Sequence, residues 1–492
     1  MQAHRRVPMS PPQIAPYPHP RASLDMRRVH CCNGAVPRNL SSMTQSSSIQ
    51  RSSSSLDRAG QRVPWAACGV AASWLIYLAG VAWRYAHCFH WHPATDFIYK
   101  SMRDYVGRGK RMWDPNYTET VADIIFPPGG HIHLGLCYYF DPSLTLAMVV
   151  QFVQSILLPL ILAAIGYELY GRRVALVALA LASIYYPFID YAAYFMTEGA
   201  YMFYLLLTMW LLVRSLRVRS TKAGLLLAVL AGIALGITAA LKTVVLFCGT
   251  VIFLHLAMVA YRSGWRRVWV FLAGSTVGLL LIVIPLIVRA TRINDGRFVA
   301  ISTNGALTVL MGHQGNVRLF RFEDPRRGSN YWFGAPSAAQ RGFTEVRKLP
   351  YGPYDSPDML RDAWQWTRDN PWHSFQLSCL NVLDLFYGSL AFPSVGEPKW
   401  KPWMYWYQRF YWVFILLPSI VHLVIHRRQL SDLQGSGLAD ALLLLPLLSL
   451  IIVSFFTIGQ PRYRIPFDTF QILLAARFYT AGRARRDGLV PK

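Results

Sequence analysis

Residues 87–140 read HCFHWHPATDFIYKSMRDYVGRGKRMWDPNYTETVADIIFPPGGHIHLGLCYYF, a polar stretch between two strongly apolar runs. A membrane helix needs about 20 predominantly apolar residues. The run before this stretch, 65–85, and the run after it, 144–170, both meet that requirement. The stretch is therefore predicted to be an aqueous loop that connects two membrane helices.

The composition of the whole chain is typical of a membrane protein. Hydrophobic residues make up 53% of the 492 residues and charged residues only 15%, which is far from the composition of a soluble domain. A net charge of +24 is also typical of nucleic-acid binders. The basic residues, however, fall in short clusters between apolar runs, which indicates contact with anionic lipid headgroups and no nucleic acid.

Ten apolar runs are candidate membrane spans, and the third and tenth are short. They are 65–85, 144–170, 174–189, 197–213, 223–241, 244–261, 268–288, 403–425, 438–456 and 467–479. With the N-terminus inside, every inward-facing connection between runs carries arginine or lysine, as the positive-inside rule requires. This arrangement places the long loops 87–143 and 290–402 on the outer side of the membrane.

The segments outside these runs differ in character. Residues 1–62 are rich in Pro, Ser and Arg and are predicted to be a disordered cytoplasmic tail. Residues 63–482 form the membrane domain, and 483–492 are a second cytoplasmic tail. In the second outer loop, 358–387 has helical periodicity that is broken at Asn370-Pro371, and its second half is predicted to lie along the membrane surface.

Asp96 is the candidate general base. A carboxylate at the outer membrane interface can take a proton from an acceptor hydroxyl, although a lone loop aspartate is more often simply solvated. Asp96, Tyr99 and Arg103 have a spacing that places them on one face of a short helix. Asp104 is the rival carboxylate on the same helix.

The turn Phe126–Gly130 is followed by two histidines. His131 and His133 are two positions apart, which suits one face of a strand better than one face of a helix. No third ligand stands at a recognised metal spacing, so we predict structural or substrate-binding histidines and no metal site. No cofactor is predicted firmly, and a divalent cation remains open. Cys88 and Cys137 flank the loop, where a disulfide is conceivable.

Four charged residues stand out in apolar surroundings. Thr197-Glu198 opens the fourth run, where Glu198 either caps a helix or orients substrate. Lys242 lies between two apolar runs, and a charge at membrane depth costs about 2.5–3.5 kcal/mol, so we expect it at an interface or in a polar cavity. Arg462 and Arg464 lie at the outer end of the last two runs, where their guanidinium groups match phosphate oxygens or outer headgroups.

Taken in order, these motifs resemble those of the integral-membrane GT-C glycosyltransferases. The resemblance is to the group that uses polyprenyl-phosphate sugars, which includes the protein mannosyltransferases and the aminoarabinose transferases of lipid A. The matching pieces are Asp96 followed by Tyr99; Pro127-Pro128-Gly129; YYP…MTE from Tyr185 to Glu198; Lys242; STNG…MGH within 302–313, which alone indicates only a loop; and RYRIP, Arg462 to Pro466.

The resemblance implies a role for each matching residue. Asp96 would be the base on the acceptor hydroxyl, and Lys242, Arg462 and Arg464 would stabilise the phosphate leaving group. The residues implied to line the substrate cavity are Tyr99, Arg103, His131 and Glu198. Phe97 stands where protein mannosyltransferases have a second acidic residue, which leaves the acceptor open.

We therefore predict an all-α polytopic membrane protein with a GT-C fold, about ten transmembrane helices and two structured outer loops. Its expected function is inverting transfer of a sugar from a polyprenyl-phosphate donor to a lipid, glycan or protein acceptor. The expected place is the outer face of a bacterial-type inner membrane, with both termini cytoplasmic. The alternatives are a lipid or solute transporter and a non-catalytic scaffold. A transporter would have polar residues near the midplane of several spans, whereas here they gather at the outer ends.

Overall fold

The structure is a computed structural model that describes residues 63–91, 100–261, 264–314, 317–325, 328–335, 342–387, 401–432 and 435–486. The chain divides into two units, 1–60 and 61–492, and all described residues belong to the second. The predicted N-terminal tail, Asp96 and Tyr99 lie outside the described residues, as do residues 487–492.

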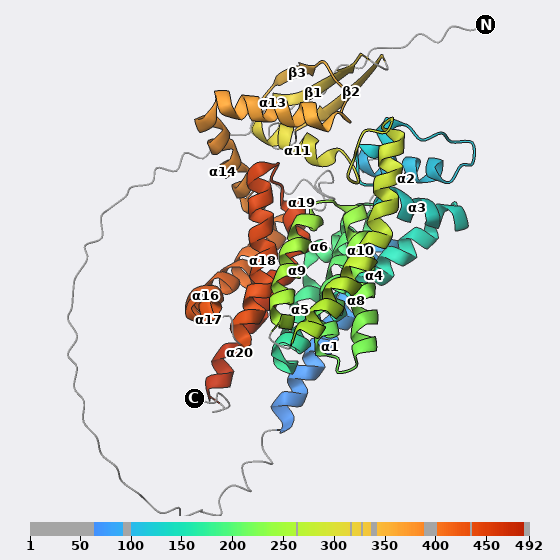
Figure 1. Ribbon diagram of the computed structural model, residues 1–492. Helices are drawn as coiled ribbons and strands as arrows, with labels where there is room; N and C mark the ends of the chain where they lie inside the picture. Colours follow the sequence, from blue (N-terminus) through green and yellow to red (C-terminus); the bar gives the residue numbers. More distant parts are fainter. Residues whose placement is uncertain are drawn as a thin grey trace, which may run out of the picture. The chain divides into compact units, whose positions relative to one another are not determined.

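Apolar helices make up most of the second unit (Figure 1). They are α1 Val63–Phe89, α4 Thr145–Tyr170, α5 Arg172–Ile184, α6 Tyr186–Asp190, α7 Thr197–Arg217, α8 Thr221–Leu241, α9 Val245–Tyr261, α10 Trp265–Ile293, α15 Lys401–Phe410, α16 Leu417–Ile425, α18 Gly435–Phe456 and α20 Asp468–Arg486. Short pieces join them: η2 Tyr191–Ala193, the π-helical η5 Tyr411–Leu416, α17 Arg427–Asp432, α19 Pro461–Arg464 and η6 Ile465–Phe467. Each of the ten apolar runs coincides with one of these helices or with a bent or continuous succession of them.

Six of the described helices are long and apolar enough to cross a membrane by length and composition. A seventh is counted if α5 and the segment from Tyr186 to Ala193, bent by 61° at their junction, form one span. The bend occurs at Tyr185, whose extended backbone ends α5, and Pro187 then stands in the first turn of α6, where a proline is tolerated. The predicted multi-pass helical architecture is therefore confirmed.

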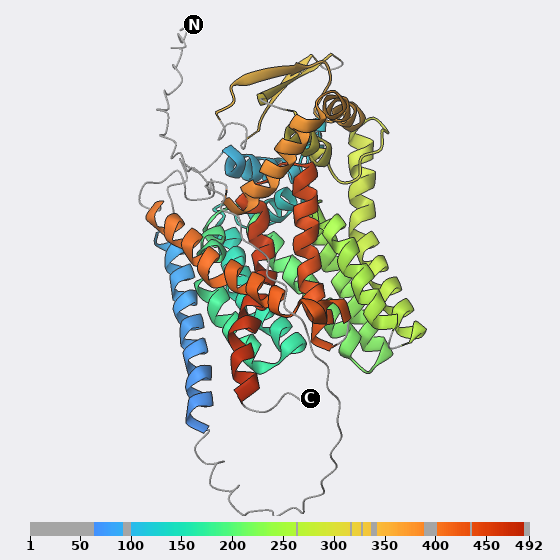
Figure 2. The same cartoon turned by 90° about the vertical axis from the view of Figure 1, so that its left-hand side faces the viewer.

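The segment predicted to be the second outer loop contains a small folded unit, called the outer unit below, with a sheet that the sequence analysis did not predict. Its elements are α11 Asn304–His313, β1 Val317–Asp324, β2 Ser329–Gly334, β3 Glu345–Leu349, α13 Ser356–Asp369 and α14 Pro371–Tyr387. The strand order is β2-β1-β3, with β1 antiparallel to β2 and parallel to β3. Both views place the sheet and α13 beyond one end of the apolar helices (Figures 1 and 2).

The core of this outer unit explains why its helices lie where they do. Phe320 and Phe322 of β1 are buried with Leu310 of α11 and Met359 of α13. The expectation of a mere loop at 302–313 is thus wrong, because the apolar side chains of α11 pack against the sheet. The predicted helix break at Asn370-Pro371 is confirmed: α13 ends at Asp369 and α14 begins at Pro371.

One amide group ties the outer unit to the membrane helices. The Asn381 side chain of α14 donates to the carbonyl oxygen of Gly312 in α11 at 3.2 Å and to that of Thr457, next to the end of α18, at 2.7 Å. Gly312 lies so close to the Thr457 backbone that a side chain there would overlap it. These contacts fix α11 against the end of α18.

The first outer loop contains α2 Lys100–Met112, the 3-10 turn η1 Val121–Ile124 and α3 Gly129–Phe140. His131 and His133 lie in α3, so the expectation that they belong to a strand is wrong. The helix forms because the Pro-Pro-Gly turn supplies its N-terminus, with Pro128 as the residue that precedes it. Cys88 and Cys137 are both buried and both unpaired.

Candidate active site

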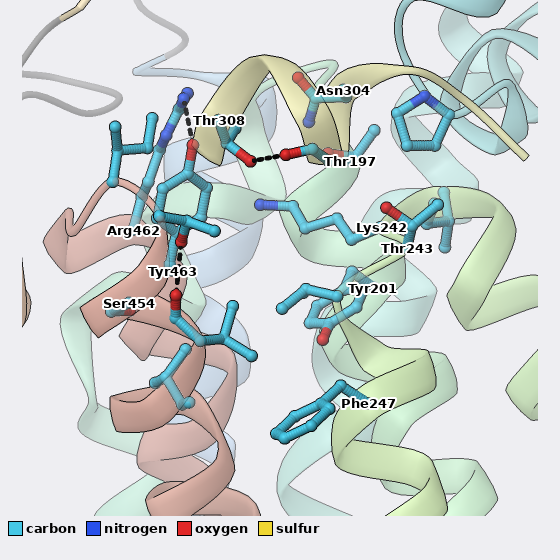
Figure 3. A pocket seen from close by; sticks show the side chains of 18 of the residues that line it. Thr197, Tyr201, Lys242, Thr243, Phe247, Asn304, Thr308, Ser454, Arg462 and Tyr463 are labelled. Carbon is cyan, nitrogen blue, oxygen red and sulfur yellow. Dashed lines mark hydrogen bonds between the residues drawn. The ribbon is translucent and has the colours of Figure 1, made fainter. Parts of the chain in front are cut away.

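A cavity of about 530 Å³ lies where the outer unit meets α7, α8, α9, α18 and α19 (Figure 3). Its lining is Phe126, Pro127, Thr197, Glu198, Tyr201, Leu241, Lys242, Thr243, Val244, Phe247, Asn304, Gly305, Thr308, Leu450, Ile452, Val453, Ser454, Phe456, Thr457, Ile458, Arg462 and Tyr463. Five of the motifs identified separately in the sequence each contribute a residue: Pro127, Glu198, Lys242, Asn304 and Arg462. Segments up to 335 residues apart in the chain therefore meet in one cavity.

Lys242 and Glu198 form an ion pair at the polar end of the cavity. The Lys242 Nζ lies 2.8 Å from the Glu198 Oε1, and the Glu198 side chain is only 2% exposed. Lys242 follows the last residue of α8, and Glu198 lies in the first turn of α7. Each charge thus complements the dipole of its own helix. Glu198 does not cap α7 through its side chain, since the residue preceding that helix is Met196 and no side-chain cap is present.

Tyr463 lies between the two cations of the cavity. The Lys242 Nζ is 5.2 Å from the centroid of the Tyr463 ring and 5.7 Å from that of Tyr201. The Arg462 Nη2 donates to the Tyr463 hydroxyl at 3.1 Å. Figure 3 shows Lys242 extending across the cavity toward the Tyr463 ring. A cation over an aromatic face is stabilised by the ring quadrupole, which helps to retain Lys242 in a weakly solvated place.

The cavity carries a net positive charge at one end and is apolar at the other. Among its lining residues only Lys242, Arg462 and Glu198 are charged, which gives the lining a net charge of +1. Phe247 of α9 and Leu450, Val453 and Phe456 of α18 form the apolar part. Figure 3 shows Phe247 on the side of Lys242 away from Asn304 and Thr308. This arrangement suits a ligand with an anionic head and an apolar chain.

The Pro-Pro-Gly turn positions the end of α8. A Cβ atom at Gly129 would lie 2.6 Å from the carbonyl carbon of Ala240 and 2.8 Å from the nitrogen of Leu241. The absence of a side chain therefore allows the start of α3 to touch the backbone just before Lys242. The conformation of Pro127 is also constrained from the other side, because Phe126 packs against the core of the outer unit.

Replacing Gly129 with alanine is expected to displace the end of α8 and with it the Lys242 ammonium. For the transferase activity that the sequence resemblance implies, a misplacement of about 1 Å in a catalytic group can cost on the order of 10²-fold in rate, so we expect donor turnover to fall about 10- to 100-fold. The Gly69→Ala variant of α1 is the matched control, since nothing lies within 4 Å of a Cβ there. Equal turnover in the two variants, measured with the same donor, would contradict this role of Gly129.

The structure separates the two arginines of the RYRIP motif. Arg464 is buried and does not line the cavity. Its Nε donates to the Asp468 Oδ1 at 2.9 Å, its Nη1 to the Leu385 carbonyl at 3.0 Å, and its Nη2 to the Tyr407 hydroxyl at 2.8 Å. The guanidinium group is fully engaged in holding α19, α14 and α15 together, and Arg462 alone faces the cavity.

His131 is buried in α3 and also does not line the cavity. Burial, reinforced by the nearby Arg108 guanidinium, lowers the pKa of His131 to about 3. The imidazole is therefore neutral near pH 7 and adds no charge to the surroundings of the cavity. Arg103 lies in α2, but its side chain, like Asp96 and Tyr99, is outside the described residues.

Several lining residues escaped the sequence analysis. Tyr201 and Tyr463 contribute the aromatic faces around Lys242, and Asn304 and Thr308 contribute polar groups from α11. In the sequence Tyr463 stands between two arginines, and its place in the cavity could have been predicted from this position. The contribution of α18 had no local signal, because the stretch of α18 that lines the cavity, 450–456, is apolar apart from Ser454.

Comparisons with known proteins identify a related family. Residues 131–288, which extend from α3 to α10, match the family model of the dolichyl-phosphate-mannose-protein mannosyltransferases. This range includes Glu198 and Lys242. No curated protein matches the chain significantly. The family match confirms the predicted resemblance to membrane glycosyltransferases of this group.

Two solved structures are distantly similar. The oligosaccharyltransferase AglB of Archaeoglobus fulgidus, in complex with an inhibitory peptide and a dolichol-phosphate, has 10% identity and a TM-score of 0.44 over 85% of this chain and 52% of that one. The oligosaccharyltransferase of the same organism in complex with Zn and sulfate has 10% identity and a TM-score of 0.46 over 84% and 50%. The chain thus spans about half the length of these proteins.

Proposed function

We propose that this protein is a membrane glycosyltransferase that moves a sugar from a polyprenyl-phosphate donor to a lipid, glycan or protein acceptor. The observation that carries the proposal is the single cavity that joins the Lys242–Arg462 cation pair to an apolar part formed by α9 and α18. The phosphate would contact the cations and the first isoprene units would contact Phe247 and α18. The match of residues 131–288 to the mannosyltransferase family supports the same donor class.

The charge of the cavity fits the change that the donor undergoes. A phosphodiester carries one negative charge, which is equal and opposite to the net charge of Lys242, Arg462 and Glu198. When the bond between the anomeric carbon and the phosphate oxygen breaks, its electron pair goes to the phosphate and the negative charge there increases. Cations aimed at developing charge stabilise the transition state more than the ground state.

Glu198 would act as a positioning residue in this mechanism. Its carboxylate fixes the Lys242 ammonium by an ion pair of 2.8 Å and leaves the remaining ammonium protons for the ligand. The pair also lowers the net charge of the empty cavity, which reduces the cost of keeping two cations in weakly solvated surroundings.

Asp96 would complete the reaction as the general base. Its carboxylate would take the proton of the acceptor hydroxyl while the acceptor oxygen forms the new bond to the anomeric carbon. Attack opposite to the leaving phosphate gives inversion. This role rests on the place of Asp96 in the first outer loop, shortly after the first apolar run.

The proposed orientation places the cavity on the outer face of an inner membrane, with both termini in the cytoplasm. It is supported by the basic connections at the opposite end of the helices, such as Arg172-Arg173 and Arg266-Arg267.

Donor turnover by the purified protein tests the proposal. With a polyprenyl-phosphate sugar and a candidate acceptor, the wild type is expected to release polyprenyl phosphate. The Lys242→Met variant is expected to release it about 10- to 100-fold more slowly, because methionine keeps the length of the side chain but removes a charge that acts on the leaving group. The Lys222→Met variant, at the exposed start of α8, is the control. Absence of turnover by the wild type with every lipid donor, together with uptake of a solute by proteoliposomes, would favour a transporter instead.

A further inference from the structure

A second cavity of about 500 Å³ lies along α4 and is also lined by residues of α1, α5 and α7. Its lining is Trp74, Leu160, Ala163, Ala164, Tyr167, Glu168, Arg172, Ala175, Leu176, Leu179, Trp210 and Arg214. We call it the α4 groove. Arg214 lies sixteen residues along α7 from Glu198, which corresponds to about 24 Å at 1.5 Å per residue. The groove is therefore a separate site from the candidate active site.

The α4 groove has a basic end. Arg214 Nη1 and Arg217 Nη1 both bind Glu168, at 2.8 Å and 3.1 Å, so that two guanidinium groups share one carboxylate. Arg172 also lines the groove, and no ion pair involves it within the described part of the chain. Among the lining residues, Arg172 and Arg214 against Glu168 give a net charge of +1, and Arg217 lies beside them without lining the groove.

The rest of the α4 groove is apolar and has a small-residue floor. Ala163, Ala164 and Ala175 leave space between the helices, and Leu160, Leu176 and Leu179 line the part farther from the arginines. Trp74 and Tyr167 are exposed beside it, at 46% and 60%. Aromatic residues of this kind are enriched at the level of lipid headgroups.

We propose that the α4 groove binds one anionic phospholipid of the leaflet at the basic end of the helices. The phosphate would lie between Arg172 and Arg214, and one acyl chain would lie over the alanine floor. The charge of the groove favours this occupant over a zwitterionic lipid, because its net positive charge attracts a headgroup with net negative charge. Basic pockets between membrane helices on the cytoplasmic side are suited to such headgroups.

The bound lipid would have a structural consequence for this part of the molecule. The arginines come from α5 and α7, whereas Glu168 comes from α4. A phosphate between Arg172 and Arg214 would join α5 to α7 in the same way as Glu168 joins α4 to α7. The lipid would thus bind where α4, α5 and α7 meet. Among the described residues, no ion pair joins α5 directly to α7.

Native mass spectrometry of the full-length protein with added phosphatidylglycerol or phosphatidylcholine tests the proposal. The Arg172→Gln/Arg214→Gln variant is expected to bind phosphatidylglycerol about 30-fold more weakly than the wild type, at about 1 kcal/mol per arginine. The Arg266→Gln/Arg267→Gln variant, which removes two exposed arginines from the start of α10, is the matched control and is expected to retain binding.

A second variant tests the groove without a change of charge. Ala164→Trp fills the floor and is expected to weaken phosphatidylglycerol binding, while the thermal unfolding temperature shows whether the fold is kept. Equal losses in both arginine variants would mean only diffuse surface charge and would overturn the proposal. Retention of binding by the Arg172→Gln/Arg214→Gln variant would also overturn the proposal. Displacement of phosphatidylglycerol by equimolar polyprenyl phosphate would overturn it as well, because the groove would then be assigned to the carrier lipid.

Discussion

Replacing Arg462 with glutamine is expected to lower kcat/KM for the donor by about 10²- to 10³-fold, the loss found when one group that stabilises developing negative charge is removed. Glutamine keeps much of the length and the hydrogen-bonding capacity of the side chain and removes the charge. The physical reason is the position of Arg462 on the far side of Tyr463 from Lys242, where it can contact the phosphate oxygen that receives the electron pair. Release of polyprenyl phosphate under single-turnover conditions measures the effect.

The Arg217→Gln variant controls for removal of an arginine as such. Arg217 is half exposed at the other end of α7 and does not line the candidate active site. An Arg462→Gln protein that turns over the donor within about twofold of the wild type would remove Arg462 from the site. A loss of turnover together with a large fall in the unfolding temperature would instead assign Arg462 to the fold.

The Asp96→Asn variant is expected to show the second large effect, a decrease of kcat by about 10²- to 10⁴-fold, the range for loss of a general base. Asparagine is close in shape but cannot take the proton of the acceptor hydroxyl. Binding of the donor is expected to be nearly unchanged, because the phosphate contacts are assigned to Lys242 and Arg462. The measurement is kcat with saturating donor and acceptor, together with the dissociation constant of the donor.

Asp104→Asn discriminates between the two carboxylates of the first outer loop. If Asp96 is the base, Asp104→Asn keeps most of the activity. The opposite pattern, with Asp96→Asn active and Asp104→Asn inactive, would transfer the assignment to Asp104. The acid limb of the pH–rate profile is expected to disappear in the inactive variant and to persist in the active one.

The apolar helices could be predicted from the sequence because hydrophobicity over about 20 residues is a local property. The cations could be recognised for a related reason, since a charge such as Lys242 between two apolar runs needs a compensating partner. The partner itself, Glu198, could not be derived from the residues alone, because 44 positions separate the two. The packing of α7 beside α8 is what brings the Glu198 and Lys242 side chains together.

The different positions of the two arginines of the RYRIP motif could not be predicted from the sequence. Arg462 and Arg464 are two residues apart, and both were assigned to the donor phosphate from their charge and from the family resemblance. Asp468 lies four residues after Arg464, and its carboxylate forms an ion pair with the Arg464 guanidinium in the protein interior. Which arginine turns inward depends on packing against Tyr407 and Tyr411, which come from a distant part of the chain.

The small sheet and α3 were mispredicted for local reasons. Strands β2 and β3 are six and five residues long, and their alternation is lost in a polar loop. The spacing of His131 and His133 favoured a strand, but the Pro-Pro-Gly turn before them starts a helix that packs on α2. The absence of a side chain at Gly109 allows this close packing of α2 against the backbone of His131.

The Asn381 amide makes the outer unit and the wall of the candidate active site parts of one cooperative folding element. Its two hydrogen bonds to Gly312 and Thr457 join three chain segments, so a local opening of α14 breaks both at once. Regions joined in this way open together rather than separately. The amide protons of α11 and of the end of α18 should therefore exchange with solvent at similar free energies of opening, although 144 residues separate Gly312 from Phe456.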